Sequence, residues 1–261
     1  MTVAPRDGIS AAINAAAMRG RPALVGFLTA GFPSRRAFKS NLAAVAAVCD
    51  VVEIGVPFSD PMADGTTIQR ASFTALADGV TLPWIFEELL SIPDRQPTPI
   101  LLMSYLNPLL SFGLAELPRA AAAAGVSGFI VPDLPFEESG DLQTALDREG
   151  LALIQMVTPV TPPQRLAMLC REARGFVYAV TMTGTTGTLK GHSTEVPNEV
   201  LEYMDRVRRL ATVPVCAGFG IRCKEQVARF AGHVDGVVVG SALVEALERG
   251  ENVQAFLSSL R

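Results

Sequence analysis

The chain has 261 residues, of which 49% are hydrophobic and 18% are charged, and its formal net charge is −4. This mildly acidic balance, with no Lys or Arg run beyond pairs such as Arg35-Arg36 and Arg208-Arg209, argues against nucleic-acid binding. The N-terminal segment lacks a signal-peptide pattern and no apolar run reaches the ~20 residues that span a bilayer, so we expect a cytoplasmic protein that does not bind membranes.

Short apolar or β-branched runs alternate along the chain with amphipathic segments. The runs predicted as strands are Leu24–Thr29, Val51–Gly55, Ile100–Ser104, Gly128–Val131, Ala152–Val157, Phe176–Val180, Val213–Ala217 and Gly236–Gly240. The segments predicted as helices are Arg36–Val48, Leu82–Leu90, Leu114–Ala124, Glu138–Glu149, Pro163–Ala173, Asn198–Ala211, Lys224–Ala231 and Ala242–Arg249. An additional helix is predicted over Ile9–Met18, before the first strand.

Regular alternation of strands and helices indicates βαβ units and a parallel sheet. Eight such units predict a closed (β/α)8 TIM barrel over residues 1–261, formed as a single domain, with the extra N-terminal helix covering its floor. An open, doubly wound sheet is the alternative fold. Two connections, Val56–Thr81 and Thr181–Pro197, are unusually long, and we expect both to be functional loops at the carboxyl ends of the strands.

Three acidic residues follow one another closely at the end of the second predicted strand. Glu53 lies in the apolar run itself, and Asp60 and Asp64 lie in the Gly- and Pro-rich loop after it. Burial raises the pKa of a carboxyl group, which predicts that Glu53 carries protons in a reaction. Asp64 is expected to stay ionised and to stabilise a developing cation or accept an N–H. Asp60 is part of a Ser-Asp-Pro turn, so we assign it a structural role.

Glycine-bearing turns follow the last three predicted strands. They contain Gly184 and Gly187 after the sixth strand, Gly218 and Gly220 after the seventh, and Gly240 with Ser241 after the eighth. A glycine lets a backbone N–H approach an anion closely, and the N-terminus of a helix adds further N–H groups. Any one of these turns alone is better explained as a simple turn. Their occurrence on consecutive strands predicts a phosphate site.

Other candidate residues point to no metal or nucleophile chemistry. Tyr178 is predicted to face into the barrel, where it helps position a carboxylate or substrate or simply packs. His192 and His233 are far apart in sequence and are expected to lie at the surface. The four cysteines, Cys49, Cys170, Cys216 and Cys223, show no CxxC spacing, which favours core packing over disulfides or a metal site.

The acidic segment and several others resemble the tryptophan synthase alpha subunit family over nearly the whole chain. The segment from Glu53 to Gly65, EIGVPFSDPMADG, looks like the family signature. Matching motifs also occur at Phe27–Pro33, Met103–Pro108, Val131–Ser139, Gly184–Gly187, Gly218–Ile221 and Gly240–Ala242. The acidic signature is specific to the family, whereas the phosphate turns occur in other phosphate-binding barrels as well.

The resemblance implies retro-aldol cleavage of indole-3-glycerol phosphate to indole and glyceraldehyde 3-phosphate, with no metal or cofactor in this chain. It implies that Glu53 is the general acid and base, that Asp64 contacts the indole N–H, and that Tyr178 supports them. It further implies that Phe27 lines the indole pocket. Thr186 and Gly187 match the loop that closes over the substrate, and Gly218, Gly220, Gly240 and Ser241 match the phosphate site.

The family works with a beta subunit that carries pyridoxal phosphate, in an alpha2beta2 tetramer, and the resemblance places Pro57, Asp60, Asn107 and Pro108 near that interface. Two residues depart from the family pattern. Thr66 stands where proline is usual, which predicts a less rigid second loop, and Lys190 stands where an arginine is expected after the sixth strand. The alternatives left open are another phosphate-sugar barrel enzyme, a non-catalytic regulator of a beta subunit, and a free-standing indole-releasing lyase.

Overall fold

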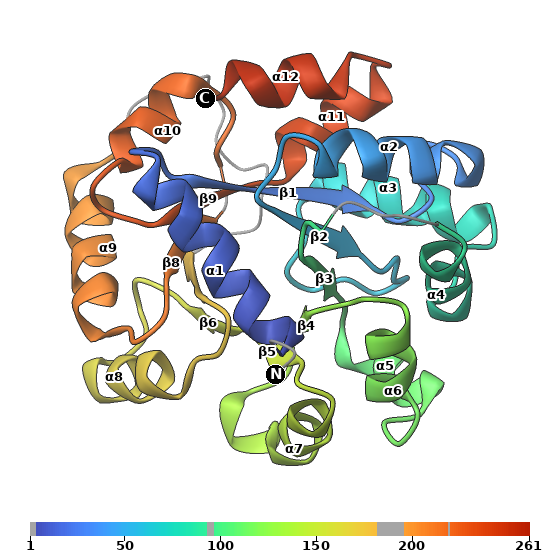
Figure 1. Ribbon diagram of the computed structural model, residues 1–261, viewed down its shortest axis with the longest axis horizontal. Helices are drawn as coiled ribbons and strands as arrows, with labels where there is room; N and C mark the ends of the chain where they lie inside the picture. Colours follow the sequence, from blue (N-terminus) through green and yellow to red (C-terminus); the bar gives the residue numbers. More distant parts are fainter. Residues whose placement is uncertain (1–3, 93–96, 182–195, 219) are drawn as a thin grey trace.

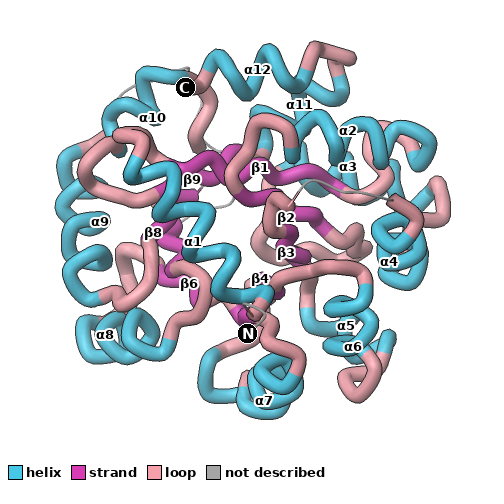
Figure 2. The backbone as a smooth tube through the Cα atoms, in the orientation of Figure 1, coloured by secondary structure: helices cyan, strands magenta, loops and turns pink. Residues whose placement is uncertain are grey.

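The computed structural model of the chain describes residues 4–92, 97–181, 196–218 and 220–261. A ring of parallel strands lies at the centre and helices surround it (Figures 1 and 2). The strands are β1 (Ala23–Thr29), β2 (Val51–Gly55), β3 (Ile100–Met103), β4 (Gly128–Ile130), β5 (Ala152–Leu153), β6 (Gln155–Val157), β7 (Val177–Val180), β8 (Val215–Gly218) and β9 (Gly236–Val239).

Twelve α-helices occur in the described part of the chain. They are α1 (Pro5–Met18), α2 (Phe38–Ala46), α3 (Thr66–Ala77), α4 (Leu82–Leu90), α5 (Leu106–Phe112), α6 (Leu117–Ala123), α7 (Gly140–Arg148), α8 (Pro163–Glu172), α9 (Asn198–Leu210), α10 (Lys224–Phe230), α11 (Ser241–Glu248) and α12 (Val253–Ser259). Two short 3-10 helices, η1 (Arg35–Ala37) and η2 (Phe136–Glu138), precede α2 and α7.

The barrel closes through one predicted strand that the structure divides in two. The sheet order is β5-β4-β3-β2-β1-β9-β8-β7-β6, so its two ends are the consecutive pieces β5 and β6, separated only by Ile154. The first piece pairs with β4 and the second with β7. A strand that is tilted in a barrel changes neighbours in this way along its length. The predicted TIM barrel is therefore confirmed, and the open doubly wound sheet is wrong.

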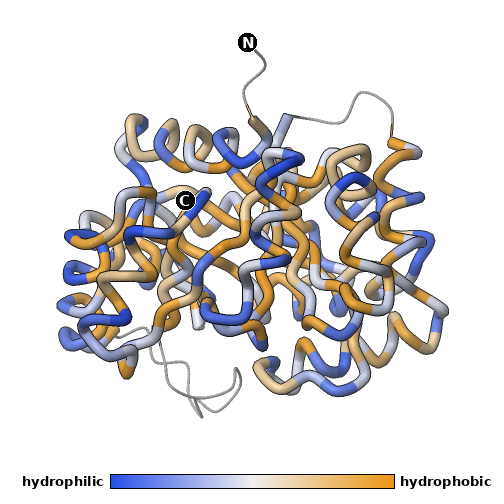
Figure 3. Tube along the Cα trace, turned by 90° about the horizontal axis from the view of Figure 1, so that it is seen from below, coloured by the Kyte–Doolittle hydropathy of each residue, from blue (hydrophilic) through white to orange (hydrophobic). Residues whose placement is uncertain are grey.

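Buried side chains form two large cores and a smaller third cluster that contains Phe27. One core fills the barrel and includes Val25, Leu101 and Phe176, whereas the other lies between the strands and the outer helices. Helix α1 crosses one opening of the barrel (Figure 1) and buries Ile9 and Ile13 against the interior core, which confirms the predicted floor helix. Hydrophobic and hydrophilic residues are interspersed along the surrounding helices (Figure 3), as expected where one face of each helix packs on the strands and the other meets water.

The connection after β2 is shorter than the sequence predicted. Residues Thr66–Ala77 form α3, so the interpretation of Val56–Thr81 as one long loop is wrong. The helical signal was present, because Ile68, Ala71 and Ala75 are buried at helical spacing. Thr66 is the first residue of α3, a position where proline is well tolerated. The departure from the family pattern thus falls at a helix start, and the loop before it ends at Gly65.

Candidate active site

Glu53 lies on β2 with its side chain inside the barrel. It is 1% exposed and pairs in register with Phe27 of β1 and Leu101 of β3, whose side chains face the same way. Its Oε2 atom has no hydrogen-bond partner among the described residues. Burial, and secondarily the charge of Asp64, raise the pKa of Glu53 to about 8. The carboxyl group is therefore protonated at neutral pH.

Asp64 lies in the loop before α3, and hydrogen bonds to Tyr105 after β3 and to Gln69 of α3 hold this loop in place. The Ala63 N–H donates to the Tyr105 hydroxyl at 2.9 Å, and the Gln69 side chain donates to the Asp64 carbonyl at 2.9 Å. Burial raises the pKa of Asp64 to about 6, while a hydrogen bond from the Tyr105 hydroxyl acts in the opposite direction. At neutral pH this carboxyl group is mostly ionised.

Tyr105 is a functional candidate that sequence reasoning missed. It lies just after β3, is 5% exposed, and its ring packs against Phe58 with centroids 5.2 Å apart. Its hydroxyl accepts a hydrogen bond from the backbone of the acidic loop, at Ala63, and lowers the pKa of the Asp64 carboxyl group. The only sequence signal was its place at the carboxyl end of a strand, between Ser104 and Leu106.

Phe27 and Tyr178 line the barrel near Glu53, and each lies against a glycine of a neighbouring strand. A Cβ on Gly55 would lie 2.5 Å from the Phe27 ring, and a Cβ on Gly218 would lie 2.2 Å from the Tyr178 ring. Tyr178 is 4% exposed, and its pKa is raised by burial and then by the charges of Glu53 and other groups, including Asp64. Both rings therefore belong to the same interior as the two acids.

The predicted phosphate turns lie at the carboxyl ends of β8 and β9. Gly218 ends β8, Gly220 follows with a φ of +87°, and Gly240 directly precedes α11, which begins at Ser241. The first N–H groups of a helix lack partners within it and favour an anion. Among the described residues, a Cβ on Gly240 would have only Phe27 Cβ, at 3.9 Å, within contact distance. Thr186, Gly187, Lys190 and His192 lie outside the described residues.

The predicted partner residues lie in the loop after β2 and in the first turn of α5, which follows β3. Asp60 and Asn107 are exposed, Pro108 is half-buried and Pro57 is buried. The Asp60 carboxylate accepts a hydrogen bond from its neighbour Ser59, as in a turn. Exposed Asp60 thus differs from buried Glu53 and half-buried Asp64.

The remaining sequence candidates have structural roles. His233 is partly exposed, and its Nδ1 lies 2.9 Å from the Asp205 carboxylate. It lies in the turn before β9, at the amino ends of the barrel strands, whereas the acidic loop lies at their carboxyl ends. Cys49, Cys170 and Cys216 are buried and unpaired, which confirms core packing for Cys49 and Cys216. Among the described residues there is no group of three His, Cys, Asp or Glu side chains suited to a metal, and no helix long and apolar enough to cross a bilayer.

Comparisons with known proteins agree with this arrangement. The family model described as "Tryptophan synthase alpha chain" matches residues 13–259. Tryptophan synthase alpha chains from Solidesulfovibrio magneticus and Geobacter sulfurreducens are 47% and 45% identical over 93% and 92% of this chain, and the same shares of their own lengths. A Mycobacterium tuberculosis tryptophan synthase structure matches with a TM-score of 0.88 and 34% identity, covering 97% of this chain and 96% of that one. A structure of the tryptophan synthase α2β2 complex from Pyrococcus furiosus matches with a TM-score of 0.84 and 32% identity, covering 92% of this chain and 98% of that one.

Proposed function

Because the chain belongs to the tryptophan synthase alpha chain family, we propose that Glu53 and Asp64 together carry out the family's reaction in this barrel. That reaction is the cleavage of indole-3-glycerol phosphate to indole and glyceraldehyde 3-phosphate. The assignment rests on three groups of residues in the site. They are the two acids, the aromatic residues Phe27 and Tyr178, and the glycine turns assigned to phosphate binding.

The observation that supports this most directly is the difference between the two carboxyl groups. The pKa of Glu53 is raised to about 8 and that of Asp64 to about 6. Between these values Glu53 holds a proton while Asp64 carries a charge. Two acids whose environments set their pKa values apart can serve as proton donor and as cation stabiliser in one step.

The chemistry follows from those two states. Protonated Glu53 donates its proton to the indole carbon that carries the glycerol chain, and the positive charge that forms on the indole ring is stabilised by the Asp64 carboxylate. The resulting Glu53 carboxylate then takes the proton of the adjacent hydroxyl as the carbon–carbon bond breaks. Indole and the aldehyde are released and Glu53 is again protonated, so no proton is gained or lost overall.

The surrounding residues would bind the rest of the substrate. Phe27 is assigned to the indole pocket, and Tyr178 to positioning beside Glu53. The phosphate group would lie at the start of α11, near Gly240 and Ser241, with Gly218, Gly220 and the loop residues Thr186 and Gly187 completing its site. The reaction needs no metal or cofactor in this chain, and pyridoxal phosphate belongs to the beta partner.

A beta subunit is the expected partner. The solved relatives include α2β2 complexes, which supports a partner of this type. We propose that the chain assembles with a beta chain into an α2β2 tetramer in the cytoplasm, that Pro57, Asp60, Asn107 and Pro108 contribute to the contact, and that indole passes to the partner.

Indole release from indole-3-glycerol phosphate tests the proposal, with and without a beta subunit. We compare the wild type with Glu53→Gln, Asp64→Asn and a control, Glu149→Gln, which changes an exposed carboxylate in the turn after α7. The two site variants are expected to lose at least about a hundredfold in kcat, since general acid–base groups contribute on this scale. The control should keep full activity.

Indole release measured with and without a beta subunit distinguishes the alpha-subunit role from the alternative functions. Weak activity that rises on adding the beta chain supports the alpha-subunit role, whereas equal activity with and without it indicates a free-standing lyase. No wild-type activity under either condition, or an active Glu53→Gln variant, would overturn the proposed roles.

A further inference from the structure

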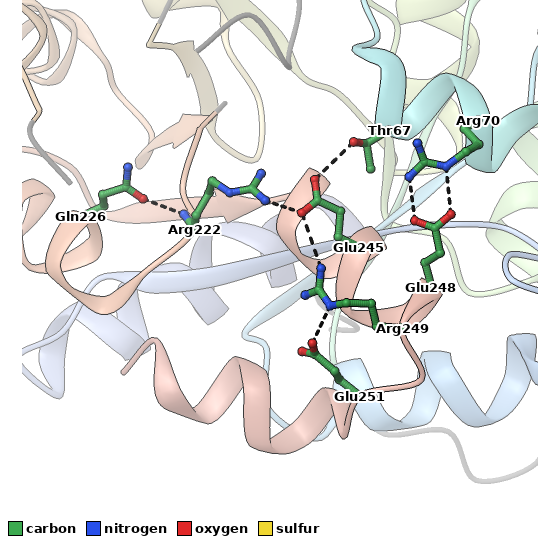
Figure 4. A network of polar contacts seen from close by, with 8 residues as sticks. All are labelled: Thr67, Arg70, Arg222, Gln226, Glu245, Glu248, Arg249 and Glu251. Atoms are coloured by element: carbon green, nitrogen blue, oxygen red, sulfur yellow. Dashed lines mark hydrogen bonds and ion pairs between the residues drawn. The ribbon is translucent and has the colours of Figure 1, made fainter. Parts of the chain in front are cut away.

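One carboxylate outside the site connects three segments that lead into it. Glu245 lies on α11, one helical turn after Ser241, and its side chain is 22% exposed. Its neighbours come from α3, from the turn after β8 and from the end of its own helix (Figure 4). None of the roles proposed above uses this residue.

The first contact joins Glu245 to the acidic loop. Thr67, three residues after Asp64, donates from its hydroxyl to Glu245 Oε1 at 3.2 Å. Thr67 is the second residue of α3, so its position and that of Asp64 are linked through less than one helical turn of backbone. The contact therefore sets where the acidic loop ends relative to α11.

The second contact joins Glu245 to the predicted phosphate turn after β8. The Arg222 guanidinium donates to Glu245 Oε2, and the Arg222 backbone N–H donates to Gln226 Oε1 at 2.7 Å. Arg222 follows Ile221, which is buried at 4% exposure, and Gly220. This end of the turn is thus held through its side chain by α11 and through its backbone by α10.

A neighbouring ion pair shows what is special about Glu245. Arg70 of α3 donates to Glu248 of α11 through two hydrogen bonds, at 2.9 Å and 2.6 Å (Figure 4). This pair links the same two helices, is more exposed than the Arg222–Glu245 pair, and among the described residues makes no hydrogen bond or ion pair with the turn after β8. Exposed ion pairs add little to stability, so neither pair is needed to hold the helices together. The distinct contribution of Glu245 is the link to the turn.

We propose that Glu245 is a positioning residue that holds the Gly220–Arg222 turn and the Asp64 loop in register with the start of α11. This inference rests on the proposed function, because it assigns phosphate binding to the start of α11 and the turn after β8. Loss of the link lets the two phosphate-binding elements move apart, which weakens substrate binding more than it weakens the fold.

The test compares Glu245→Ala with the matched control Glu248→Ala, which breaks the other ion pair between the same helices. For Glu245→Ala we expect a KM for indole-3-glycerol phosphate about three- to tenfold higher, the scale of losing a small, partly exposed network. Binding of inorganic phosphate, measured by calorimetry, should weaken by a similar factor. Glu248→Ala should change neither quantity, and both variants should melt near the wild-type temperature.

Two further variants assign the effect to individual contacts. Thr67→Val removes only the contact to α3, and Glu245→Gln keeps an oxygen acceptor for Thr67 while losing the charge that pairs with Arg222. A larger KM increase for Glu245→Gln than for Thr67→Val points to the phosphate turn. If Thr67→Val instead raises KM more than Glu245→Gln does, while kcat falls and phosphate binding is unchanged, Glu245 positions only the acidic loop. That result would overturn its proposed role in the turn after β8.

The outcomes separate this inference from the proposed function. If the wild type cleaves the substrate, Glu53→Gln does not, and Glu245→Ala behaves like Glu248→Ala, the positioning role alone is wrong. If the wild type shows no cleavage, the proposed function fails. Phosphate binding to Glu245→Ala still decides the positioning role, because that measurement does not depend on turnover.

Discussion

The ring of Tyr178 occupies the space that a side chain on Gly218 would need. A Cβ on Gly218 would lie 2.2 Å from Tyr178 Cε1 and 2.5 Å from its hydroxyl oxygen. Gly218 therefore has a packing role on β8 that is separate from any contact with phosphate. Gly240 differs, because within the described part of the chain a Cβ there would meet only Phe27 Cβ, at 3.9 Å. The two glycines of the predicted phosphate site can thus be told apart by substitution.

Gly218→Ala is expected to displace Tyr178 and to reduce both stability and activity. Overpacking a buried site costs about 1–3 kcal/mol in the free energy of unfolding. Urea denaturation measures this loss, and indole release measures the effect of moving a ring that lies beside Glu53. Unchanged stability would mean that Tyr178 moves freely and that the close packing has no consequence.

Gly240→Ala is expected to leave the free energy of unfolding nearly unchanged while raising KM for the phosphorylated substrate. The reason is that the added methyl group meets no described atom closer than 3.9 Å but would lie where a phosphate approaches the start of α11. Calorimetric titration with inorganic phosphate gives the change in affinity directly. An unaltered affinity would place the phosphate elsewhere.

Tyr105→Phe is expected to move the acidic limb of the pH profile of kcat/KM upward by about one pH unit, the scale of a hydrogen bond to a charged group. The Tyr105 hydroxyl lowers the pKa of Asp64, so its loss leaves a smaller ionised fraction near pH 6. Tyr203→Phe is the control, since the buried Tyr203 hydroxyl has no partner among the described residues. A profile that shifts in neither variant would argue against Asp64 as the ionised group.

Glu53→Gln is expected to make stability less dependent on pH. The pKa of Glu53 is 4.5 in its ordinary state and about 8 in the folded protein, so the unfolded chain binds fewer protons between these values. The contribution of Glu53 to the free energy of unfolding is fully present below pH 4.5 and is lost as the pH rises through about 8. Relative to wild type, the variant should therefore gain stability from pH 5 to pH 8, as measured by urea midpoints. Parallel curves for the two proteins would show that the group is not buried in this state.

Thr66→Pro is expected to stabilise the protein by about 0.4–1 kcal/mol, because proline at the first position of a helix restricts the unfolded chain without removing a helical hydrogen bond. Gly65 before it is extended, with φ −79° and ψ 169°, which suits a following proline. Thermal denaturation measures the gain. A lower melting temperature would show that the backbone before α3 cannot accept the ring.

Much of the fold could be predicted because its signals are local. The period of the apolar residues marked each strand and most helices within a few residues, and alternation implied the parallel barrel. Helices α3, α5 and α12 were not predicted. Helix α3 has the same helical spacing, but its place after a Pro-rich loop concealed it. The break between β5 and β6 could not be predicted, since it depends on where one strand changes neighbours around the barrel.

By itself, the sequence determined that Glu53 lies in a buried strand, that Asp64 lies in the loop after it, and that glycine turns follow the last strands. These features depend on the order of residues along the chain and on local geometry. The carboxyl ends of parallel strands lie at one end of the barrel whatever the exact packing of the side chains. Only the tertiary structure decided how far burial raises the pKa of Glu53, the hydrogen bond from the acidic loop to Tyr105 and the three-way contact of Glu245. Each depends on burial or on side chains from distant segments, because desolvation and hydrogen bonding are set by neighbours in space and not along the chain.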